Sequence, residues 1–378
     1  MSVLSWALMR LGLSTKRLVV KVGSAVLAGE GGLDREAMGE IARQVALLWQ
    51  EGREVVLVSS GAVAAGMRRL GLERRPQDMP LKQALAAVGQ PLLMALWQEA
   101  FAPLGLTVGQ VLLTAEDLSA RSRYLNAKAT LRALLGLGVL PVINENDTVA
   151  FAEIRFGDND QLSARVAALV EAGLLLILSD VDALYEEDPK RNPLARPILE
   201  VERVEGVLAH AGEGNPLGSG GMKSKLLAAR IAGRVGIPTL LLPGRRPGAI
   251  LEALSGAPIG TYFHAKRRYR GEKAWLYGLT RPKGELVLDG GAVRALKERG
   301  ASLLPAGIRE VRGRFSRGEA VRLLSEGGEE VGVGLANYAS EEIARIKGRK
   351  SSEIEAILGY RYTEEVVHRD HLALKEEA

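Results

Sequence analysis

The stretch that begins at residue 139 reads Val139-Leu-Pro-Val-Ile-Asn-Glu-Asn-Asp147, and it decides the fold. Its first five residues are apolar, which is typical of a strand that is buried on both faces of a parallel sheet. The run then changes at once into amides and carboxylates. Because open α/β sheets bind their ligands at the carboxyl ends of such strands, we expect an α/β protein with a polar site directly after residue 143.

Acidic side chains continue beyond this strand, as far as Gly157-Asp-Asn-Asp160. Five acidic residues and three asparagines fall within residues 143–160. Crowded carboxylates are costly unless a cation joins them, and amides supply both donors and acceptors. The pattern favours a small zwitterion, or an anion accompanied by lysines. A solvated acidic loop is the alternative, and it ranks second because Phe151, Ile154 and Phe156 would hold such a loop against the protein.

Similar apolar runs alternate with amphipathic helices over the first two-thirds of the chain. The predicted strands are Arg17–Val22, Glu54–Ser59, Val108–Leu113, Val139–Ile143, Leu174–Ser179 and Thr239–Leu242. The predicted helices are Asp34–Glu51, Lys82–Ala102, Ala120–Leu137, Asp160–Ala172 and Lys223–Ala232. This alternation predicts βαβ units and therefore a three-layer αβα sandwich.

The character of the sequence changes after residue 258. A basic connector, Lys266-Arg-Arg-Tyr-Arg270, precedes shorter strands that are separated by glycine turns. The predicted strands here are Ala274–Leu279, Glu285–Leu288, Ile308–Arg312, Ala320–Leu324 and Glu330–Gly334, with helices at Gly290–Arg299 and Ser340–Lys347. We expect a small, mostly β second domain. The expected boundaries are an N-terminal extension 1–15, a large domain 16–262, a linker 263–273, a small domain 274–358 and a tail 359–378.

The composition excludes several classes of chemistry. The chain has no cysteine, so disulfides, thiolate catalysis and cysteine-bound metals are excluded, and a reducing, cytoplasmic location is expected. Of its four histidines only His368 and His371 are close together, and their polar surroundings favour a solvated tail over a zinc site. No run approaches the ~18 apolar residues of a membrane span. The N-terminus lacks the pattern of a signal peptide, so we expect no membrane attachment.

Two motifs combine lysine with glycine at places that suit a phosphate. Lys21-Val-Gly-Ser24 ends the first predicted strand, and Gly218-Ser-Gly-Gly-Met-Lys-Ser-Lys225 opens a helix. Lysine supplies a point charge, and glycines let backbone N–H groups approach phosphate oxygens. Neither motif is a P-loop or a dinucleotide fingerprint. The alternative interpretation of the first motif is a lysine at a strand edge without a phosphate ligand, and that of the second is a flexible surface loop.

Two further strand ends carry polar groups. In Ser59-Ser-Gly-Ala-Val-Ala-Ala-Gly66 a strand runs into small residues that open a helix, whose N–H groups would face an anion. Ser60 would add a hydroxyl, although a tight strand–helix joint explains the motif equally well. Asp180, after Ser179, either accepts from a ribose or base or caps a turn. No nucleophile with an adjacent base is evident, which favours phosphoryl transfer, a reaction that needs positioning and charge neutralisation.

Five motifs follow one another in a fixed order over residues 16–260. They are Lys21-Val-Gly-Ser24, Ser59-Ser-Gly-Ala-Val-Ala-Ala-Gly66, Asn144-Glu-Asn-Asp147, Gly157-Asp-Asn-Asp160 and Gly218-Ser-Gly-Gly-Met-Lys-Ser-Lys225. Together they resemble the amino-acid kinase superfamily, and within it the branch that phosphorylates glutamate. The resemblance implies ATP-dependent phosphorylation of the γ-carboxylate of L-glutamate, the first step of proline synthesis. A kinase for another small acid is the alternative.

The resemblance also implies roles for individual residues. Lys21 and Lys225 would stabilise charge on the transferring phosphoryl group, and Asp158 would hold the two lysines in position. Glutamate would be bound by Ser60, Asp147 and Asn159. The residues expected to bind ATP are Lys21, Ser179, Asp180, Ser219, Gly220, Gly221, Met222, Lys223, Ser224 and Lys225. Mg²⁺ would be carried mainly on the ATP phosphates rather than by a protein metal site.

Partners are expected as well. Besides glutamate and ATP, the resemblance implies proline as a competing inhibitor, and we expect a homo-oligomer. Leu303-Leu-Pro-Ala-Gly-Ile308 and Phe315-Ser-Arg-Gly-Glu319 resemble a PUA domain, a module known from RNA-modifying enzymes. Residues 266–350 hold 19 basic and 11 acidic residues, a net +8, which favours RNA binding through this domain. The scarcity of aromatic residues for base stacking counts against it.

Overall fold

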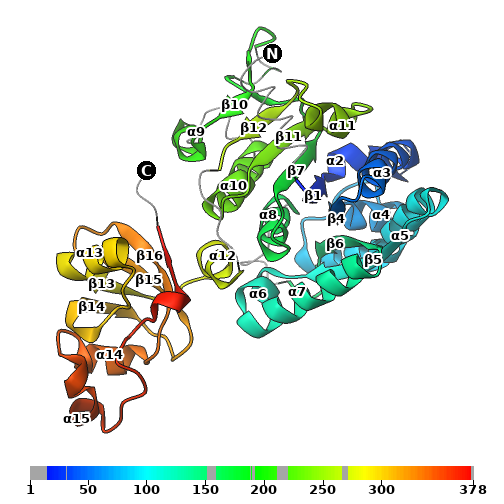
Figure 1. The fold of residues 1–378 in the computed structure, drawn as a ribbon. Coiled ribbons are helices and arrows are strands. Elements are labelled where there is room, and N and C mark those ends of the chain that lie inside the picture. Colours follow the sequence, from blue (N-terminus) through cyan, green and yellow to red (C-terminus); the bar gives the residue numbers. More distant parts are fainter. Residues whose placement is uncertain are drawn as a thin grey trace. The chain divides into compact units, whose positions relative to one another are not determined.

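The computed structural model describes residues 15–30, 32–150, 159–187, 189, 192–210, 220–265 and 271–375. The chain divides into two compact units, residues 1–268 and residues 269–378. The first is a mixed α/β unit with a large, mostly parallel sheet, and the second is mostly β (Figure 1). Within the described ranges, no helix is both long and apolar enough to cross a membrane.

The first unit contains an eight-stranded sheet in the order β10-β12-β11-β7-β1-β4-β6-β5. Its strands are β1 (Arg17–Val22), β4 (Glu54–Ser59), β5 (Thr107–Leu113), β6 (Val139–Glu145), β7 (Leu174–Ser179), β10 (Glu200–Val201), β11 (Thr239–Pro243) and β12 (Thr261–Phe263). Neighbouring strands are parallel except for the pair β11–β12. The carboxyl ends of β1, β4, β6, β7 and β11 therefore lie along one edge of the sheet, and all six predicted strands are confirmed.

Helices cover both faces of this sheet, which confirms the predicted three layers. On one side lie α3 (Arg35–Gln50), α5 (Met79–Phe101) and α11 (Ala249–Leu254), and on the other lie α8 (Asn159–Leu169) and α10 (Gly220–Arg234) (Figure 1). The remaining elements of the unit are α2 (Ser24–Leu27), α4 (Ala62–Arg69), α6 (Ala115–Ser119), α7 (Arg121–Gly136), α9 (Val204–His210), β2 (Ala28–Gly29), β3 (Gly32–Leu33), β8 (Leu184–Tyr185) and β9 (Pro197–Ile198).

The central strand β1 faces two different environments. Leu18, Val20 and Val22 belong to the apolar core that also contains α3 and α5. Since successive side chains of a strand point to opposite faces, Val19 and Lys21 face the other layer, where α8 packs against β1. The alternation of the strand thus places a charged lysine beneath a helix.

Two helices that follow β4 pack with their backbones almost in contact. A Cβ atom on Gly89 of α5 would lie 1.7 Å from the carbonyl oxygen of Ala62 in α4, and one on Gly66 would lie 1.9 Å from that of Leu85. Gly61, which precedes α4, has a φ of 119°, a conformation that favours glycine. The small-residue motif after Ser60 therefore serves packing, and this packing fixes where α4 begins.

The second unit is built on a five-stranded sheet in the order β14-β13-β15-β16-β17. Its elements are α12 (Gly271–Gly278), β13 (Gly284–Leu288), α13 (Gly290–Arg299), β14 (Ile308–Gly313), β15 (Ala320–Ser325), β16 (Glu330–Leu335), α14 (Ser340–Ile346), α15 (Ile354–Leu358) and β17 (Leu372–Leu374). Only the pair β13–β15 is parallel. The small, mostly β domain is confirmed.

Two expectations for this unit are wrong. The run Ala274–Leu279 is not a strand but most of helix α12, where the N–H groups of Leu279 and Thr280 donate to the carbonyl of Trp275. A short apolar run has no periodicity that separates a strand from a buried helix. The residues after 358 are not a mere tail, because β17 pairs with β16 and Val367 is fully buried in the core of the unit.

Candidate active site

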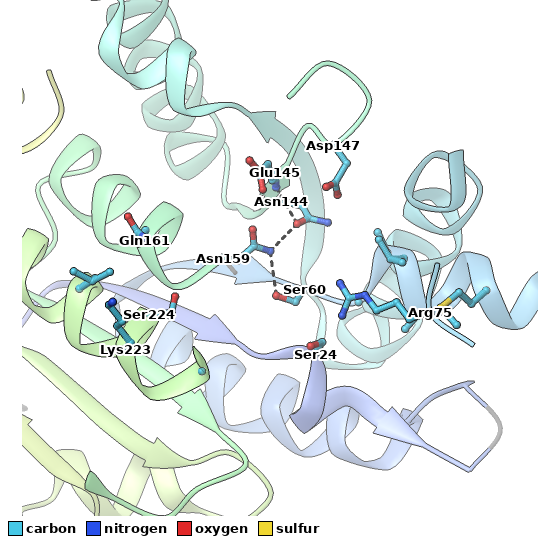
Figure 2. Close-up of a pocket in the computed structure, with 17 residues that line it drawn as sticks. Ser24, Ser60, Arg75, Asn144, Glu145, Asp147, Asn159, Gln161, Lys223 and Ser224 are labelled. Carbon is cyan, nitrogen blue, oxygen red and sulfur yellow. Dashed lines mark hydrogen bonds between the residues drawn. The ribbon is translucent and has the colours of Figure 1, made fainter. Parts of the chain in front are cut away.

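A cavity of about 570 Å³ lies at the edge of the large sheet where β4 and β6 end. Its lining comes from the start of α2, the start of α4, the α4–α5 loop, the end of β6, the start of α8 and the start of α10 (Figure 2). The lining residues are Ser24, Ser60, Gly61, Ala62, Val63, Ala64, Met67, Arg75, Asn144, Glu145, Asp147, Asn159, Gln161, Gly221, Lys223, Ser224 and Leu227. Segments that are far apart in the sequence thus form one site.

Next to this cavity, one carboxylate is shared by two lysines. The Nζ atom of Lys21 lies 2.6 Å from Oδ1 of Asp160, and the Nζ atom of Lys225 lies 3.5 Å from Oδ2. Lys21 and Asp160 are fully buried, whereas Lys225 is 8% exposed. Lys225 also donates to the carbonyl oxygen of Gly221 at 3.1 Å, and Gly221 lines the cavity. The lysine pair (Lys21 and Lys225) thus brings two positive charges together beside the cavity, which favours an anion there.

The elements explain why these three groups meet. Lys21 faces α8 because of the alternation of β1, and Asp160 lies in the first turn of α8. Lys225 lies on α10, which packs against α8. Burial of an ion is costly, and breaking a buried pair leaves an uncompensated charge. The three side chains are therefore held together by the electrostatic cost of separating them.

A chain of hydrogen-bonded amide side chains leads to Ser60 and fixes the orientation of the amides that line the cavity. Gln90 donates to Gln110 (3.0 Å), Asn144 donates to Gln90 (2.7 Å), and Asn159 donates to Asn144 (2.7 Å). Asn159 also donates to the hydroxyl of Ser60 at 3.1 Å. Each amide in this chain (Gln110, Gln90, Asn144 and Asn159) is oriented by its neighbour. The amide nitrogen of Asn159 is thereby engaged, and its carbonyl oxygen turns away from Ser60 (Figure 2).

Comparison with known proteins agrees with this arrangement. The model of the amino acid kinase family matches residues 16–242. Glutamate 5-kinase of Thermus thermophilus is 88% identical over 370 residues, covering 98% of this chain and 100% of that protein. The chain belongs to the amino acid kinase family, among its glutamate 5-kinases. The glutamate 5-kinase of Meiothermus ruber is 62% identical over 365 residues, covering 96% of each chain.

The comparison also covers the second unit of this family member. The model of the PUA domain matches residues 284–358, which confirms the resemblance of the small domain. A solved structure, UMP kinase from Bacillus anthracis, matches with a TM-score of 0.47 and 16% identity over 66% of this chain and 96% of that chain. The expected kinase domain followed by a PUA domain is thus confirmed by the two family models.

The structure brings most of the expected site residues of this kinase together. Ser60, Asp147 and Asn159 all line the cavity, and each is less than a tenth exposed. From α10, Gly221, Lys223 and Ser224 line it as well. Their assignment to glutamate or to ATP stays a prediction.

Other expected residues lie elsewhere. Ser179 ends β7 and Asp180 follows it, and the Ser179 hydroxyl lies 3.2 Å from Oδ1 of Asp180, but neither residue lines this cavity. Met222 is half-buried on α10 outside the lining, and Gly220 begins that helix. Asp158 and Ser219 lie outside the described residues.

Sequence reasoning missed two charged groups of this site. The first is Asp160, which contacts both lysines. The role predicted for Asp158 stays a prediction, since Asp158 lies outside the described residues. The signal for Asp160 was available, because this carboxylate lies in the first turn of a helix that carries the apolar residues Leu162, Val166 and Leu169. The second is Arg75, which lines the cavity from the loop between α4 and α5. Nothing in the pair Arg74-Arg75 indicated which arginine would reach the site.

A metal site was not expected on the protein itself. Within the described ranges, no three or more histidine, aspartate or glutamate side chains are grouped so that they could hold a metal ion. The carboxylate of Asp160 contacts both lysines, which compete with any cation for its oxygens.

Proposed function

We propose that this protein transfers the γ-phosphoryl group of ATP to the γ-carboxylate of L-glutamate, the first step of proline synthesis. The observation that carries the proposal is the lysine pair, held on one buried carboxylate, beside a cavity lined by amides and acids. The 88% identity to a protein named glutamate 5-kinase supports the same reaction.

The chemistry follows from charge. The γ-carboxylate is already ionised near neutral pH, so it attacks the γ-phosphorus of ATP without a general base. The bond from that phosphorus to the bridging oxygen breaks as the new bond forms, and ADP leaves. Negative charge spreads over the phosphoryl oxygens during transfer, and Lys21 and Lys225 neutralise it. Asp160 is a positioning residue, because it contacts the lysines rather than the reacting atoms.

ATP and its metal occupy the α10 side of the site in this proposal. The glycine-rich segment up to Lys225 and the strand end at Ser179 and Asp180 would contact the nucleotide. Kinases of this kind act on ATP together with Mg²⁺, which favours phosphate oxygens and water. Because the lysines already contact Asp160, the metal is expected on the ATP phosphates.

The acceptor side binds the amino acid. Asp147 offers a carboxylate to the substrate ammonium, the carbonyl oxygen of Asn159 offers an acceptor, and Ser60 offers a hydroxyl. Proline shares the α-carboxylate and the amine but lacks the attacking carboxylate, so it competes for this subsite without being phosphorylated. RNA binding by the PUA domain stays a prediction.

The direct test is ATP consumption in the presence of glutamate, with hydroxylamine added to trap the acyl phosphate as a hydroxamate. Activity with L-glutamate that exceeds activity with aspartate, acetate and glutarate by at least tenfold supports the proposal. Turnover of a different small acid with glutamate inert would overturn it.

Asp147→Ala is expected to raise the KM for glutamate by about tenfold to a hundredfold, because a charge-assisted contact contributes roughly 1.5–3 kcal/mol. The KM for ATP should change less than twofold. The same variant should weaken inhibition by proline. Steady-state kinetics with each substrate varied in turn measures all three constants, and an unchanged glutamate KM would remove Asp147 from the substrate subsite.

Gln90→Leu is expected to disturb the acceptor side from a distance. Gln90 does not line the cavity, yet its side chain accepts from Asn144, which accepts from Asn159. Leucine removes the acceptor and leaves an amide group of Asn144 without a partner, so Asn159 is less firmly oriented. We expect a glutamate KM several-fold higher with an unchanged ATP KM. Gln90→Glu keeps an acceptor for Asn144 and should restore much of the loss; equal effects of the two variants would contradict the orienting role.

A chain that ends at His264 is expected to fold and to phosphorylate glutamate, because every described residue of the cavity lies in the first unit. Circular dichroism and the hydroxylamine assay check the two halves of this expectation. A shortened chain that is folded but inactive would show that the second unit is needed for catalysis.

A further inference from the structure

The cavity contains a cation for which the proposed roles give no use. Arg75 extends from the loop between α4 and α5 toward Ser60 (Figure 2). It is exposed, and within the described residues no ion pair or hydrogen bond joins it to another side chain. The other charged side chains of the lining are the carboxylates of Glu145 and Asp147 and the ammonium group of Lys223. An arginine that points into this cavity and pairs with neither of its carboxylates is available for an anionic ligand.

The position of Arg75 separates it from the phosphoryl chemistry. In Figure 2, Lys223 and Ser224 lie on one side of the cavity and Arg75 lies on the opposite side, with Ser60 between them. An acceptor that directs its γ-carboxylate toward the lysine pair must place its α-carbon at the far end. That end is the one where Asp147 and Arg75 lie.

The charges at this end match the two groups on an α-carbon. Asp147 suits the ammonium, but an α-carboxylate beside Asp147 and Glu145 would be repelled unless a cation accompanied it. The guanidinium of Arg75 offers paired donors that match a carboxylate. The first residues of α4, Ala62 and Val63, also line the cavity, and the positive end of that helix adds to the attraction.

We propose that Arg75 binds the α-carboxylate of the amino-acid acceptor and so selects an α-amino acid over an acid or amine that lacks this group. The proposal rests on the glutamate kinase function stated above. Arg75 and Asp147 together bind the zwitterion, because Arg75 contacts the α-carboxylate and Asp147 contacts the α-ammonium. The lysine pair acts on the phosphoryl group.

The test compares the full-length protein with Arg75→Ala, Arg75→Lys and Arg74→Ala. Arg74 is the matched control, since it is also exposed, belongs to the same loop and does not line the cavity. Arg75→Ala should raise the glutamate KM at least tenfold and leave kcat and the ATP KM within about twofold. The glutamate KM of Arg75→Lys should lie between those of the wild type and Arg75→Ala, because lysine keeps the charge but not the paired donors. Arg74→Ala should match the wild type.

Two competitive inhibitors then locate the contact. Glutarate keeps both carboxylates but lacks the ammonium, and γ-aminobutyrate keeps the ammonium but lacks the α-carboxylate. Arg75→Ala should weaken inhibition by glutarate and leave inhibition by γ-aminobutyrate unchanged. Asp147→Ala should weaken inhibition by γ-aminobutyrate and leave inhibition by glutarate unchanged. A glutamate KM that changes less than threefold, or an equal loss for both inhibitors, overturns the role of Arg75. A wild-type protein that does not phosphorylate glutamate instead overturns the proposed function, and this assay of the unmodified chain keeps the two failures apart.

Discussion

Replacing Lys225 with alanine is expected to lower kcat by a hundredfold or more while the KM for glutamate changes little. Removal of one preorganised charge that acts on a developing anion costs about 10²–10³ in rate. Lys225 lies 3.5 Å from the shared carboxylate and donates to the carbonyl oxygen of Gly221, so it is held beside the cavity that Gly221 lines. Its charge matters most when negative charge develops on the phosphoryl group, which is why kcat rather than substrate affinity should fall.

Lys223→Ala provides the comparison. Lys223 lies on the same helix and lines the cavity, but it is exposed and makes no ion pair with Asp160. We expect Lys223→Ala to act mainly on the KM for ATP and to lower kcat much less than Lys225→Ala does. Single-turnover measurements separate the transfer step from product release. A Lys225→Ala enzyme that keeps more than about a tenth of the wild-type kcat would show that Lys225 is not catalytic.

Asp160→Asn is expected to impair both folding stability and catalysis. The substitution preserves shape but removes the carboxylate that lies 2.6 Å from Lys21, which is fully buried. Removing one partner of a buried pair destabilises by about 3–5 kcal/mol, because the other charge remains uncompensated. Both lysines should lose their fixed positions, so kcat should fall by orders of magnitude. Urea unfolding of the first unit and steady-state kinetics measure the two effects.

A double variant separates the two roles of this pair. In Lys21→Met/Asp160→Leu the two fully buried charges are replaced by apolar groups of similar volume, a change that is often neutral for stability, while the less buried Lys225 is retained. We expect the free energy of unfolding to recover most of the loss seen in Asp160→Asn, while activity stays absent. Recovery of activity in the double variant would mean that neither residue takes part in phosphoryl transfer. A single Asp160→Asn variant as stable as the wild type would contradict the buried ion pair.

The central part of the first domain could be predicted from the sequence. The six predicted strands are long apolar runs with clear polar ends, and each lies within two residues of its expected bounds, whereas the short strands β10 and β12 at one side of the sheet were not predicted. In the second domain the run Ala274–Leu279 was assigned wrongly, because six apolar residues fit a buried helix as well as a strand. The strand β17 was missed because three residues give too little pattern, and only pairing with β16 reveals them.

For the site, the sequence by itself determined which chemistry is present and roughly where. Strand ends carry their polar residues locally, so Lys21, Ser60 and Asp147 could be assigned to one edge of the sheet before any coordinates. The tertiary structure alone decided which groups meet. Asp160 contacts two lysines from distant segments because α8 lies over β1 and packs against α10. Arg75, rather than its neighbour, enters the cavity because the loop between α4 and α5 directs it there. Contacts of this kind depend on the packing of whole helices and on loop geometry, and a local pattern of residues does not encode either.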